Sequence, residues 1–578
     1  MKDNNKHFIF GRFSSTAGQV WRRRCPVVLF WLTIAVLAIP NIALCFTERM
    51  TFTAGLTNVL LPCSVVWLLM TLSRRSGKMT WFMFPLIFFA AFQIVLLYLF
   101  GHSIIAVDMF LNLVTTNPGE AFELLDNLLP AIAIVVVLYV PLLVMATVSL
   151  RSRDMLDMFF IRRQRRMALV AVAAGALSLG ASYAADREYS ARIQMYPINV
   201  FYNLALAVER SEVTAAYAGS SAGFRSYSKA THPDSLREVY VLVIGETARA
   251  YSFSLYGYGR KTTPLLERTE GLVAFTDVLT QSNTTHKSVP MLMSAARAED
   301  YERIYREKGI ITAFKEAGFH TVFISNQLPN RSFIDFFGEE ADEWEFIKEK
   351  SAGKGIVYDS DMLPIVKNVL AKGRRKEFIV LHTYGSHFNY RERYRPESAV
   401  FKPDNASEAK SANRASLINA YDNSIRSTDK FLHDLITLLG KSGAASAMLY
   451  TSDHGENIFD DSRQIFLHAS PVPSFYELHV PFIIWTSASY RHDFAPEVAA
   501  LNANRRKSVA SSASVYHTML GLAGIDTPLR NDSLSVASSM FTPAESMYLN
   551  DHNEAVPVNK IMRDKEDFIM MDKVKAAR

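Results

Sequence analysis

Long apolar runs dominate the chain as far as Ala185, and shorter apolar runs alternate with polar stretches after it. A helix needs about 20 apolar residues to cross the hydrocarbon core of a membrane. Five runs approach that length, and we expect transmembrane helices at residues 27–46, 52–72, 81–100, 128–150 and 167–185. Four more runs and no clear cleavage site follow the first run, so we expect a membrane span there and not a signal peptide.

Basic residues fall in every second loop of this part, and such a bias sets the orientation of membrane helices. They occupy residues 22–24 before the first span, 74–78 between the second and third, and 151–166 between the fourth and fifth. The loop at residues 101–127 has no Lys or Arg. We predict a cytoplasmic N-terminus and a domain outside the cytoplasmic membrane after the fifth span.

The loop at residues 101–127 has the pattern of an amphipathic helix that lies at a membrane surface. Asn112, Thr116 and Glu120 recur every four residues and would share one face of that helix. Pro118 could break the helix at this point. On pattern alone, a solvated face explains the three polar residues as well as a binding role does.

After a polar bridge at residues 186–236, strand-like and helical patterns alternate through residues 237–578. We expect core strands at residues 239–244, 321–324, 378–381, 447–450 and 482–485. Helical patterns between them include residues 310–317, 362–371 and 419–439. This alternation predicts an α/β domain with a mainly parallel sheet flanked by helices. Ligands of such sheets gather at the carboxyl ends of the strands.

Composition narrows the chemistry of this second part. All three cysteines lie in or beside the first two apolar runs, so residues 186–578 contain neither a disulfide nor a catalytic cysteine. The formal net charge of +6 is modest. Membrane topology explains the basic residues better than nucleic-acid binding does, and we expect no nucleic-acid partner.

Two strand ends carry residues suited to a metal ion. Glu246 follows the run at residues 239–245, where an unpaired carboxylate would be costly to bury. Asp453 and His454 follow the run at residues 448–452 and precede Gly455, which lets the backbone turn close to an ion. Carboxylate and neutral imidazole are both zinc ligands. Alone, Glu246 fits a salt bridge as well, whereas the Asp-His-Gly-Glu sequence is more specific.

Other candidate site residues are weaker evidence when each is taken alone. Thr285, in Asn-Thr-Thr-His-Lys-Ser-Val-Pro, could be a nucleophile if a metal or a base lowers the pKa of its hydroxyl. Such a threonine is also a common helix cap, and the spacing does not exclude Thr284. His387 and His468 follow or lie near strands, where a histidine often has a structural role.

Together these segments resemble the phosphoethanolamine transferases that decorate lipid A, which belong to the alkaline phosphatase and sulfatase superfamily. The resemblance covers nearly the whole chain and implies a fold of that superfamily for residues 237–578, behind a transmembrane domain of five helices at residues 1–185. It implies Thr285 as nucleophile and zinc ligand, with Glu246, Asp453 and His454 as the other ligands. It further implies one zinc ion and leaves a second open.

The resemblance also implies roles for residues that would contact the substrate and not the metal ion. His387 and His468 match histidines that lie near the substrate phosphate in that family. Asn112, Thr116 and Glu120 match its lipid-contacting residues with the same spacing.

Two departures from the family pattern stand out. Gln281 and Met291 occupy positions where we would expect cysteines, so other contacts must hold the nucleophile loop. A family lysine that follows an Asn-Asn segment is absent, and Arg331, which follows Asn326-Gln327, could replace it as a bidentate phosphate ligand.

The resemblance implies transfer of phosphoethanolamine from phosphatidylethanolamine to an envelope acceptor, through a phosphoethanolamine-threonine intermediate and with release of diacylglycerol. Lipid A is the preferred acceptor, and core sugars or another glycan stay open. A glycerol-phosphate transferase of the lipoteichoic-acid synthase type is the alternative, and a membrane-anchored binding protein is the rival outside enzymes. We expect a monomeric, multi-pass inner-membrane protein with a periplasmic catalytic domain.

Overall fold

The computed structural model describes residues 16–576, apart from residues 49, 101–104, 116–117, 188, 352–354 and 407. Side chains are described from residue 24 onward, with residues 99–100, 112–115 and 118–128 as further exceptions. The chain divides into two compact units. The first unit is Met1–Ala106 with Leu128–Leu206, and the second is Val107–Asn127 with Ala207–Arg578.

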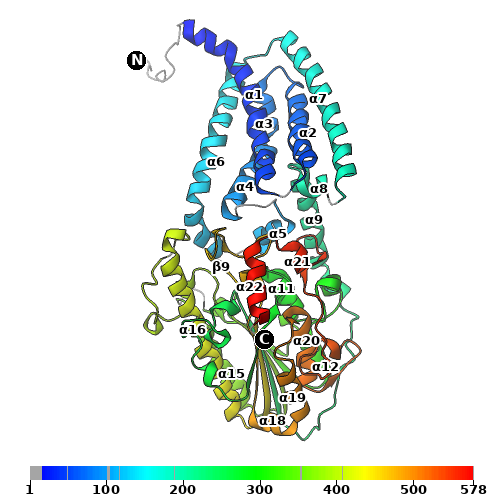
Figure 1. Cartoon of the computed structure of the whole chain (residues 1–578), viewed down its shortest axis with the longest axis vertical. Helices are drawn as coiled ribbons and strands as arrows, with labels where there is room; N and C mark the ends of the chain where they lie inside the picture. Colours follow the sequence, from blue (N-terminus) through cyan, green and yellow to red (C-terminus); the bar gives the residue numbers. More distant parts are fainter. Residues whose placement is uncertain are drawn as a thin grey trace, which may run out of the picture. The chain divides into compact units, whose positions relative to one another are not determined.

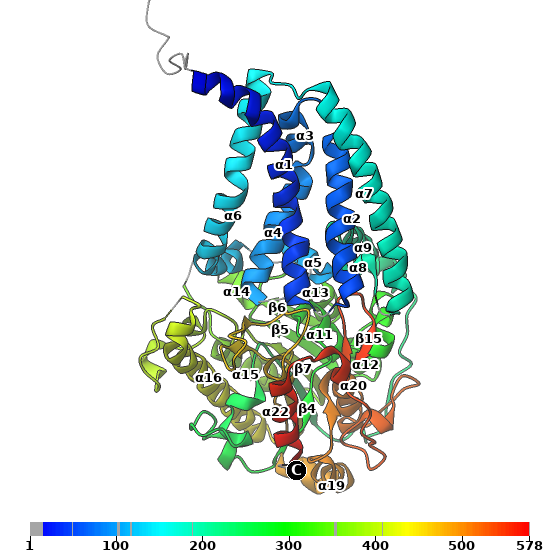
Figure 2. The ribbon, with the colours of Figure 1, turned by 45° about the horizontal axis from the view of Figure 1, so that its top comes forward.

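The first unit contains long apolar helices that run side by side (Figures 1 and 2). Four of them are long and apolar enough to span a membrane, and they are α1 (Thr16–Thr47), α2 (Phe52–Met70), α6 (Pro118–Ser152) and α7 (Met158–Ala185). The third predicted span is instead a pair of helices, α3 (Ser76–Phe82) and α4 (Phe84–Phe100), bent by 60°. The described residues therefore hold four candidate spans, or five if the bent pair is one span.

Small and hydroxylated residues bring α2 and α7 close together. The hydroxyl of Thr57 lies 2.6 Å from that of Ser178 and 2.8 Å from that of Ser182. A Cβ atom on Gly175 would lie only 3.0 Å from Cα of Leu61. Apolar helices in a lipid-like environment associate through such close packing and interhelical hydrogen bonds.

The second unit is built on a seven-stranded sheet with the order β3-β11-β8-β2-β7-β5-β6. The strands are β2 (Glu238–Gly245), β3 (Leu272–Phe275), β5 (His320–Ser325), β6 (Glu343–Phe346), β7 (Lys376–His382), β8 (Ala445–Ser452) and β11 (Phe482–Thr486). All five predicted core strands are present. The sheet is mixed, because β11 pairs antiparallel with both β8 and β3 while β8, β2, β7, β5 and β6 are parallel.

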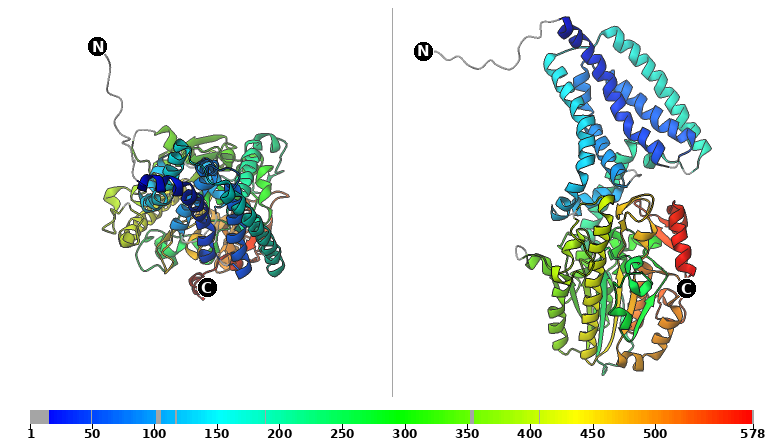
Figure 3. Two further views of the ribbon diagram at one scale, coloured as in Figure 1. Left: turned by 90° about the horizontal axis from the view of Figure 1, so that it is seen from above. Right: turned by 60° about the vertical axis from the view of Figure 1, so that its left-hand side comes forward.

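Both faces of the sheet are covered by helices (Figure 3). Along β2, Tyr240, Leu242 and Ile244 join the core on one side, with residues of α11 (Thr285–Leu292), α12 (Ile310–Glu316) and α20 (Ser511–Leu522). Val239, Val241 and Val243 join the other core, with residues of α15 (Leu363–Ala371) and α16 (Arg414–Lys441). Burial on both faces explains why the sequence of β2 is a continuous apolar run.

The sheet brings the two predicted metal-binding segments together. β2 and β8 are parallel neighbours, and Gly245 pairs with Ser452 in their register. Glu246 and Asp453 therefore leave the sheet side by side at its carboxyl edge, where ligands of parallel sheets bind.

Candidate metal centre

Three buried side chains converge at this edge: Glu246, Asp453 and His454. Nε2 of His454 lies 3.5 Å from Oε1 of Glu246 and 3.2 Å from Oδ2 of Asp453. The exposed fractions of the three side chains are 1%, 0% and 0%, so water does not solvate their charges. Buried carboxylates in contact need a cation or a proton to compensate them.

Two glycines permit the tight backbone around the cluster. Gly385 has φ of +51°, and a Cβ there would lie 2.4 Å from the carbonyl oxygen of Glu246. A Cβ on Gly455 would lie 2.1 Å from the carbonyl oxygen of Tyr476. Larger residues at either position would push the segments that carry the ligands apart.

Thr285 places its hydroxyl against the cluster. It is the first residue of α11, and Oγ1 lies 3.3 Å from Oε1 of Glu246 and 3.2 Å from Nε2 of His454. The hydroxyl of Thr284 instead contacts that of Ser282, at 3.1 Å. Of the two threonines that the sequence left open, Thr285 is the one in contact with the metal-ligand candidates.

The spacing of these atoms fits zinc. Four ligand atoms about 2.0–2.1 Å from a tetrahedral zinc lie ~3.3 Å from one another. Oγ1 of Thr285 to Glu246 and to His454, and Nε2 of His454 to Glu246 and to Asp453, are separated by 3.2 to 3.5 Å. In addition, Oδ2 of Asp453 is buried and has no hydrogen-bond partner among the described residues. The donor set and its geometry therefore suit one zinc ion.

The proton positions also suit a metal. Nδ1 of His454 lies 2.9 Å from the carbonyl oxygen of Gly455, which can only accept a hydrogen bond, so Nδ1 carries the proton. Nε2 then presents its lone pair to the cluster, as a ligand must. Burial and the neighbouring Asp453 raise the pKa of Glu246, and burial raises that of Asp453. Burial lowers the pKa of His454, but the two carboxylates outweigh it and raise the pKa overall.

Comparison with known proteins decides the family of this unit. Residues 238–525 match the sulfatase family. The chain carries a sulfatase-family domain.

Part of the chain aligns with phosphoethanolamine transferases. The chain is 29% identical over 326 residues to phosphoethanolamine transferase CptA of Salmonella typhimurium, covering 54% of this chain and 55% of that protein. It is 29% identical over 306 residues to Kdo(2)-lipid A phosphoethanolamine 7''-transferase of Escherichia coli, covering 51% and 53%. The chain thus spans about half the length of these curated relatives.

Solved structures share the fold. The periplasmic domain of EptC from Escherichia coli, in a complex with zinc, matches 59% of this chain and 97% of that chain, with a TM-score of 0.52 and 22% identity. The integral membrane phosphoethanolamine transferase EptA of Neisseria meningitidis matches 88% of this chain and 98% of its own, with a TM-score of 0.64 and 20% identity. The second match includes the apolar helices as well as the sulfatase-family domain.

A row of histidine rings extends from the metal-ligand candidates of the sulfatase-family domain. The ring centroid of His468 lies 4.1 Å from that of His454 and 6.1 Å from that of His387. Burial lowers the pKa of His387 and of His468 well below the usual value. Nδ1 of His468 lies 3.2 Å from Oε1 of Glu456, whose pKa burial raises well above its usual value. Both predicted outer histidines are therefore near the cluster and neutral.

Polar contacts hold the segment before Thr285, in which Gln281 stands where the family pattern would have a cysteine. The buried side chain of Gln281 accepts from the backbone of Ala298 and donates to Glu299. The amide of Asn283 donates to the carbonyl oxygen of Ser470 at 2.8 Å and to Glu477 at 2.9 Å. These contacts hold Gln281 and Asn283 in place before Thr284.

Sequence analysis gave no role to Gln327, although its position after β5 signals a site residue. Its amide donates to Oε2 of Glu246 and to the carbonyl oxygen of Thr383, each at 3.0 Å. Gln327 thus orients one of the metal-ligand candidates.

The remaining predicted residues have different outcomes. Arg331 is exposed and has no ion-pair partner among the residues that the structure describes. Thr116 lies outside the described residues, and so do the side chains of Asn112 and Glu120. Asn112 lies on α5 (Val107–Thr115) and Glu120 on α6, which begins at Pro118, so the two do not belong to one helix.

Proposed function

We propose that the chain transfers phosphoethanolamine from phosphatidylethanolamine to a cell-envelope acceptor, with lipid A as the preferred acceptor. The single observation that carries the proposal is the position of the Thr285 hydroxyl, 3.2 Å from His454 and 3.3 Å from Glu246 in a buried cluster with zinc-ligand spacing. The names of the aligned relatives support the transferred group.

Thr285 is the proposed nucleophile. Zinc held by Glu246, Asp453, His454 and Thr285 would lower the pKa of the alcohol. Oγ1 of Thr285 bonds to the donor phosphorus as the bond from phosphorus to the glycerol oxygen breaks. Diacylglycerol then leaves with the proton that Thr285 gave up. An acceptor oxygen next bonds to the phosphorus as the bond from phosphorus to Oγ1 of Thr285 breaks, and the proton that the acceptor gives up returns to Thr285.

The position of the proton on the His387 ring limits the chemical roles that this residue can have. Nδ1 lies 2.6 Å from the carbonyl oxygen of Phe388, so Nδ1 carries the proton and Nε2 has a free lone pair. With its pKa held well below the usual value by burial, the neutral ring presents Nε2 as a proton acceptor or a cation ligand. We therefore favour His387 as a hydrogen-bond acceptor toward the acceptor molecule, or as a ligand of a second cation, over a proton donor to diacylglycerol.

The remaining roles follow the sequence analysis. Arg331 would bind a phosphate, and Asn112, Thr116 and Glu120 would contact lipid. The basic loops support an inner-membrane protein with a cytoplasmic N-terminus and a periplasmic catalytic domain. We expect a monomer.

Mass spectrometry of the purified chain after incubation with phosphatidylethanolamine tests the proposal. We expect a phosphoethanolamine adduct on Thr285, and phosphoethanolamine on lipid A from cells that contain the chain. Thr285→Val keeps the side-chain volume and should abolish the adduct, whereas the matched control Thr284→Val should retain it. A glycerol-phosphate adduct after a parallel incubation with phosphatidylglycerol, and none from phosphatidylethanolamine, would instead favour the lipoteichoic-acid synthase type. An adduct on Thr284 would refute the assignment of the nucleophile.

A further inference from the structure

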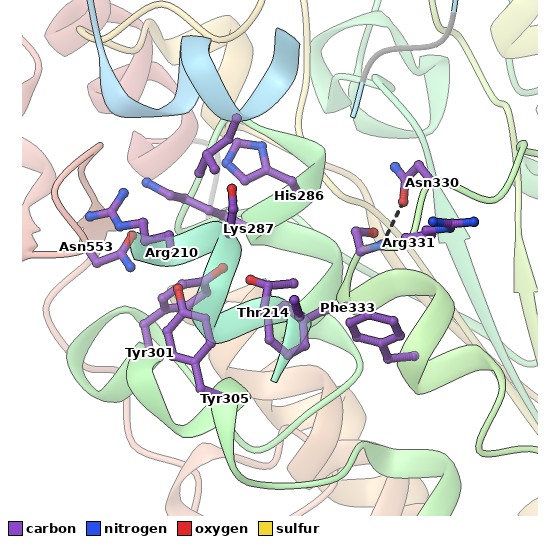
Figure 4. A pocket seen from close by; sticks show the side chains of 15 residues that line it. Arg210, Thr214, His286, Lys287, Tyr301, Tyr305, Asn330, Arg331, Phe333 and Asn553 are labelled. Atoms are coloured by element: carbon purple, nitrogen blue, oxygen red, sulfur yellow. Dashed lines mark hydrogen bonds between the residues drawn. The ribbon is translucent and has the colours of Figure 1, made fainter. Parts of the chain in front are cut away.

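A cavity of about 600 Å³ lies within the second unit, and its wall includes His286 and Lys287, which directly follow Thr285. Its volume is within the range of roughly 300–1,000 Å³ that is usual for small-molecule sites. Apolar atoms form most of its accessible wall, and its aromatic and aliphatic residues are Leu111, Ala215, Tyr301, Tyr305, Phe333 and Phe336. Figure 4 shows Tyr301, Tyr305 and Phe333 around this space, with Lys287 and Arg210 at one end.

Two segments of the cavity wall come directly from the reactive centre. His286 and Lys287 follow the proposed nucleophile Thr285 in the first turn of α11. Asn330–Ser332 lie three to five residues after Gln327, whose amide donates to Oε2 of Glu246 at 3.0 Å. A molecule whose phosphate lies at Thr285 could therefore extend an attached group into this cavity.

Two cations at the cavity, Lys287 and Arg210, are already compensated, and the third, the exposed Arg331, is the one that the proposed function assigns to a phosphate. Nζ of Lys287 lies 2.7 Å from Oδ2 of Asp108 and donates to the carbonyl oxygen of Asn550 at 2.7 Å. Arg210 donates to the carbonyl oxygen of Asp551 at 2.6 Å and lies 3.9 Å from Asp108. A phosphate bound between these cations would have to displace a buried carboxylate. The wall therefore favours an apolar chain over an anionic head group.

We propose that this cavity receives an acyl chain of the donor phospholipid while the donor phosphate lies at Thr285. The inference rests on the proposed function, because diacylglycerol is the leaving group there and consists mainly of two apolar chains. Holding the donor by the part that is not transferred lets binding energy position the phosphorus for attack. Leu111 adds a contact from α5, a short helix with the amphipathic pattern of membrane-surface segments.

Photolabelling tests the placement directly. We would use phosphatidylethanolamine with a diazirine at the end of one acyl chain, with the full chain in detergent, and map the adducts by peptide mass spectrometry. We expect adducts on the peptides that contain Tyr301, Tyr305 or Phe333. Adducts confined to the apolar helices of the first unit would overturn the inference. An acceptor lipid that carries the same diazirine serves as the comparison. If it labelled the cavity and the donor did not, the assignment of the cavity to a donor acyl chain would be overturned.

Filling the cavity gives a second test. Ala215→Trp and Thr214→Leu place bulk at its wall, whereas Val213→Trp lies on the same helix, α9 (Ile198–Ala215), and outside the wall. We expect Ala215→Trp to lower kcat/KM for a long-chain donor at least about tenfold, which corresponds to the loss of about two buried methylene groups. Turnover of a dihexanoyl donor should change less than about threefold, and Val213→Trp should match the parent. Equal losses with both donors would overturn the inference.

The two proposals fail in different ways. If the chain does not transfer phosphoethanolamine, no donor yields an adduct on Thr285 in the parent protein. If only the cavity is assigned wrongly, the parent forms that adduct, but the photolabel misses the cavity peptides and the filled variants keep the parent preference for chain length.

Discussion

Removal of one partner from a buried ion pair should destabilise the second unit strongly, and Asp108→Asn is the variant that tests this expectation. Asp108 of α5 faces three basic side chains, with separations of 2.7 Å to Lys287, 3.3 Å to His286 and 3.9 Å to Arg210. The side chain of Asp108 is 13% exposed and that of Lys287 is 2% exposed. Burial raises the pKa of Asp108, but Lys287 and His286 outweigh it and lower the pKa below the usual value.

The expected loss follows from what the variant leaves behind. Removal of one partner from a buried pair costs about 3–5 kcal/mol, because the other charge stays buried without compensation. Burial already lowers the pKa of Lys287 despite Asp108, so the lysine can shed its proton and limit the loss. We therefore expect Asp108→Asn to lower the free energy of unfolding by about 3 kcal/mol. The double variant Asp108→Leu/Lys287→Met, with both charges gone, should fall within about 1 kcal/mol of the parent.

Denaturant unfolding of the purified chain in detergent measures these differences through the cooperative transition of the second unit. Glu267→Gln is the matched control, since it breaks an exposed pair with Lys261, which is 75% exposed. Such a pair contributes less than about 1 kcal/mol. Asp108→Asn could lose no more stability than this control, or the double variant could be less stable than Asp108→Asn. Either result would show that the two charges do not compensate each other in the folded chain.

Three further predictions concern the metal, its orientation and pH. Chelation should remove about one zinc ion per chain and lower both thermal stability and activity. Readdition of zinc should restore both, and activity of the metal-free chain would refute the proposed zinc site. Gln327→Ala should weaken zinc binding roughly 10–100-fold in chelator competition, because Glu246 loses the amide that orients it. Burial raises the pKa of Asp422 to about 6 despite Arg260, so its contribution to folding is present below about pH 4 and is lost as pH rises through 6. Asp422→Asn should therefore gain up to about 3 kcal/mol relative to the parent between pH 4 and pH 7 in unfolding measurements, and a relative loss would show that Arg260 dominates.

The strands and the metal-ligand candidates could be predicted from the sequence because local signals coincide there. The apolar run of β2 and that of β8 each end in a polar motif, and parallel neighbours put those ends at one edge. Glu246, Asp453 and His454 therefore converge as the motifs indicate. Thr285 needed the three-dimensional structure, since only the start of α11 shows which of two adjacent hydroxyls contacts the cluster.

Other features depend on contacts far apart in the chain. The antiparallel placement of β11 is not visible in its apolar run, because a strand that is buried on both faces has the same composition in either direction. The bend between α3 and α4 divides an apolar run that has the length of one straight span. The partner of Lys287 is Asp108, 179 positions earlier in the chain, and no local pattern joins the two.

Helix α11 connects these observations in one element. Its first residue, Thr285, contacts the metal-ligand candidates, and Lys287 pairs with Asp108 of α5. Farther along the helix, Val289 and Met291 are buried in the core beneath the sheet. α5 could therefore shift relative to Thr285 only by breaking this ion pair or by displacing packed side chains, and both are costly. This argues that α5 and the nucleophile move as one body, so a lipid chain that contacts Leu111 would be held in fixed register with Thr285.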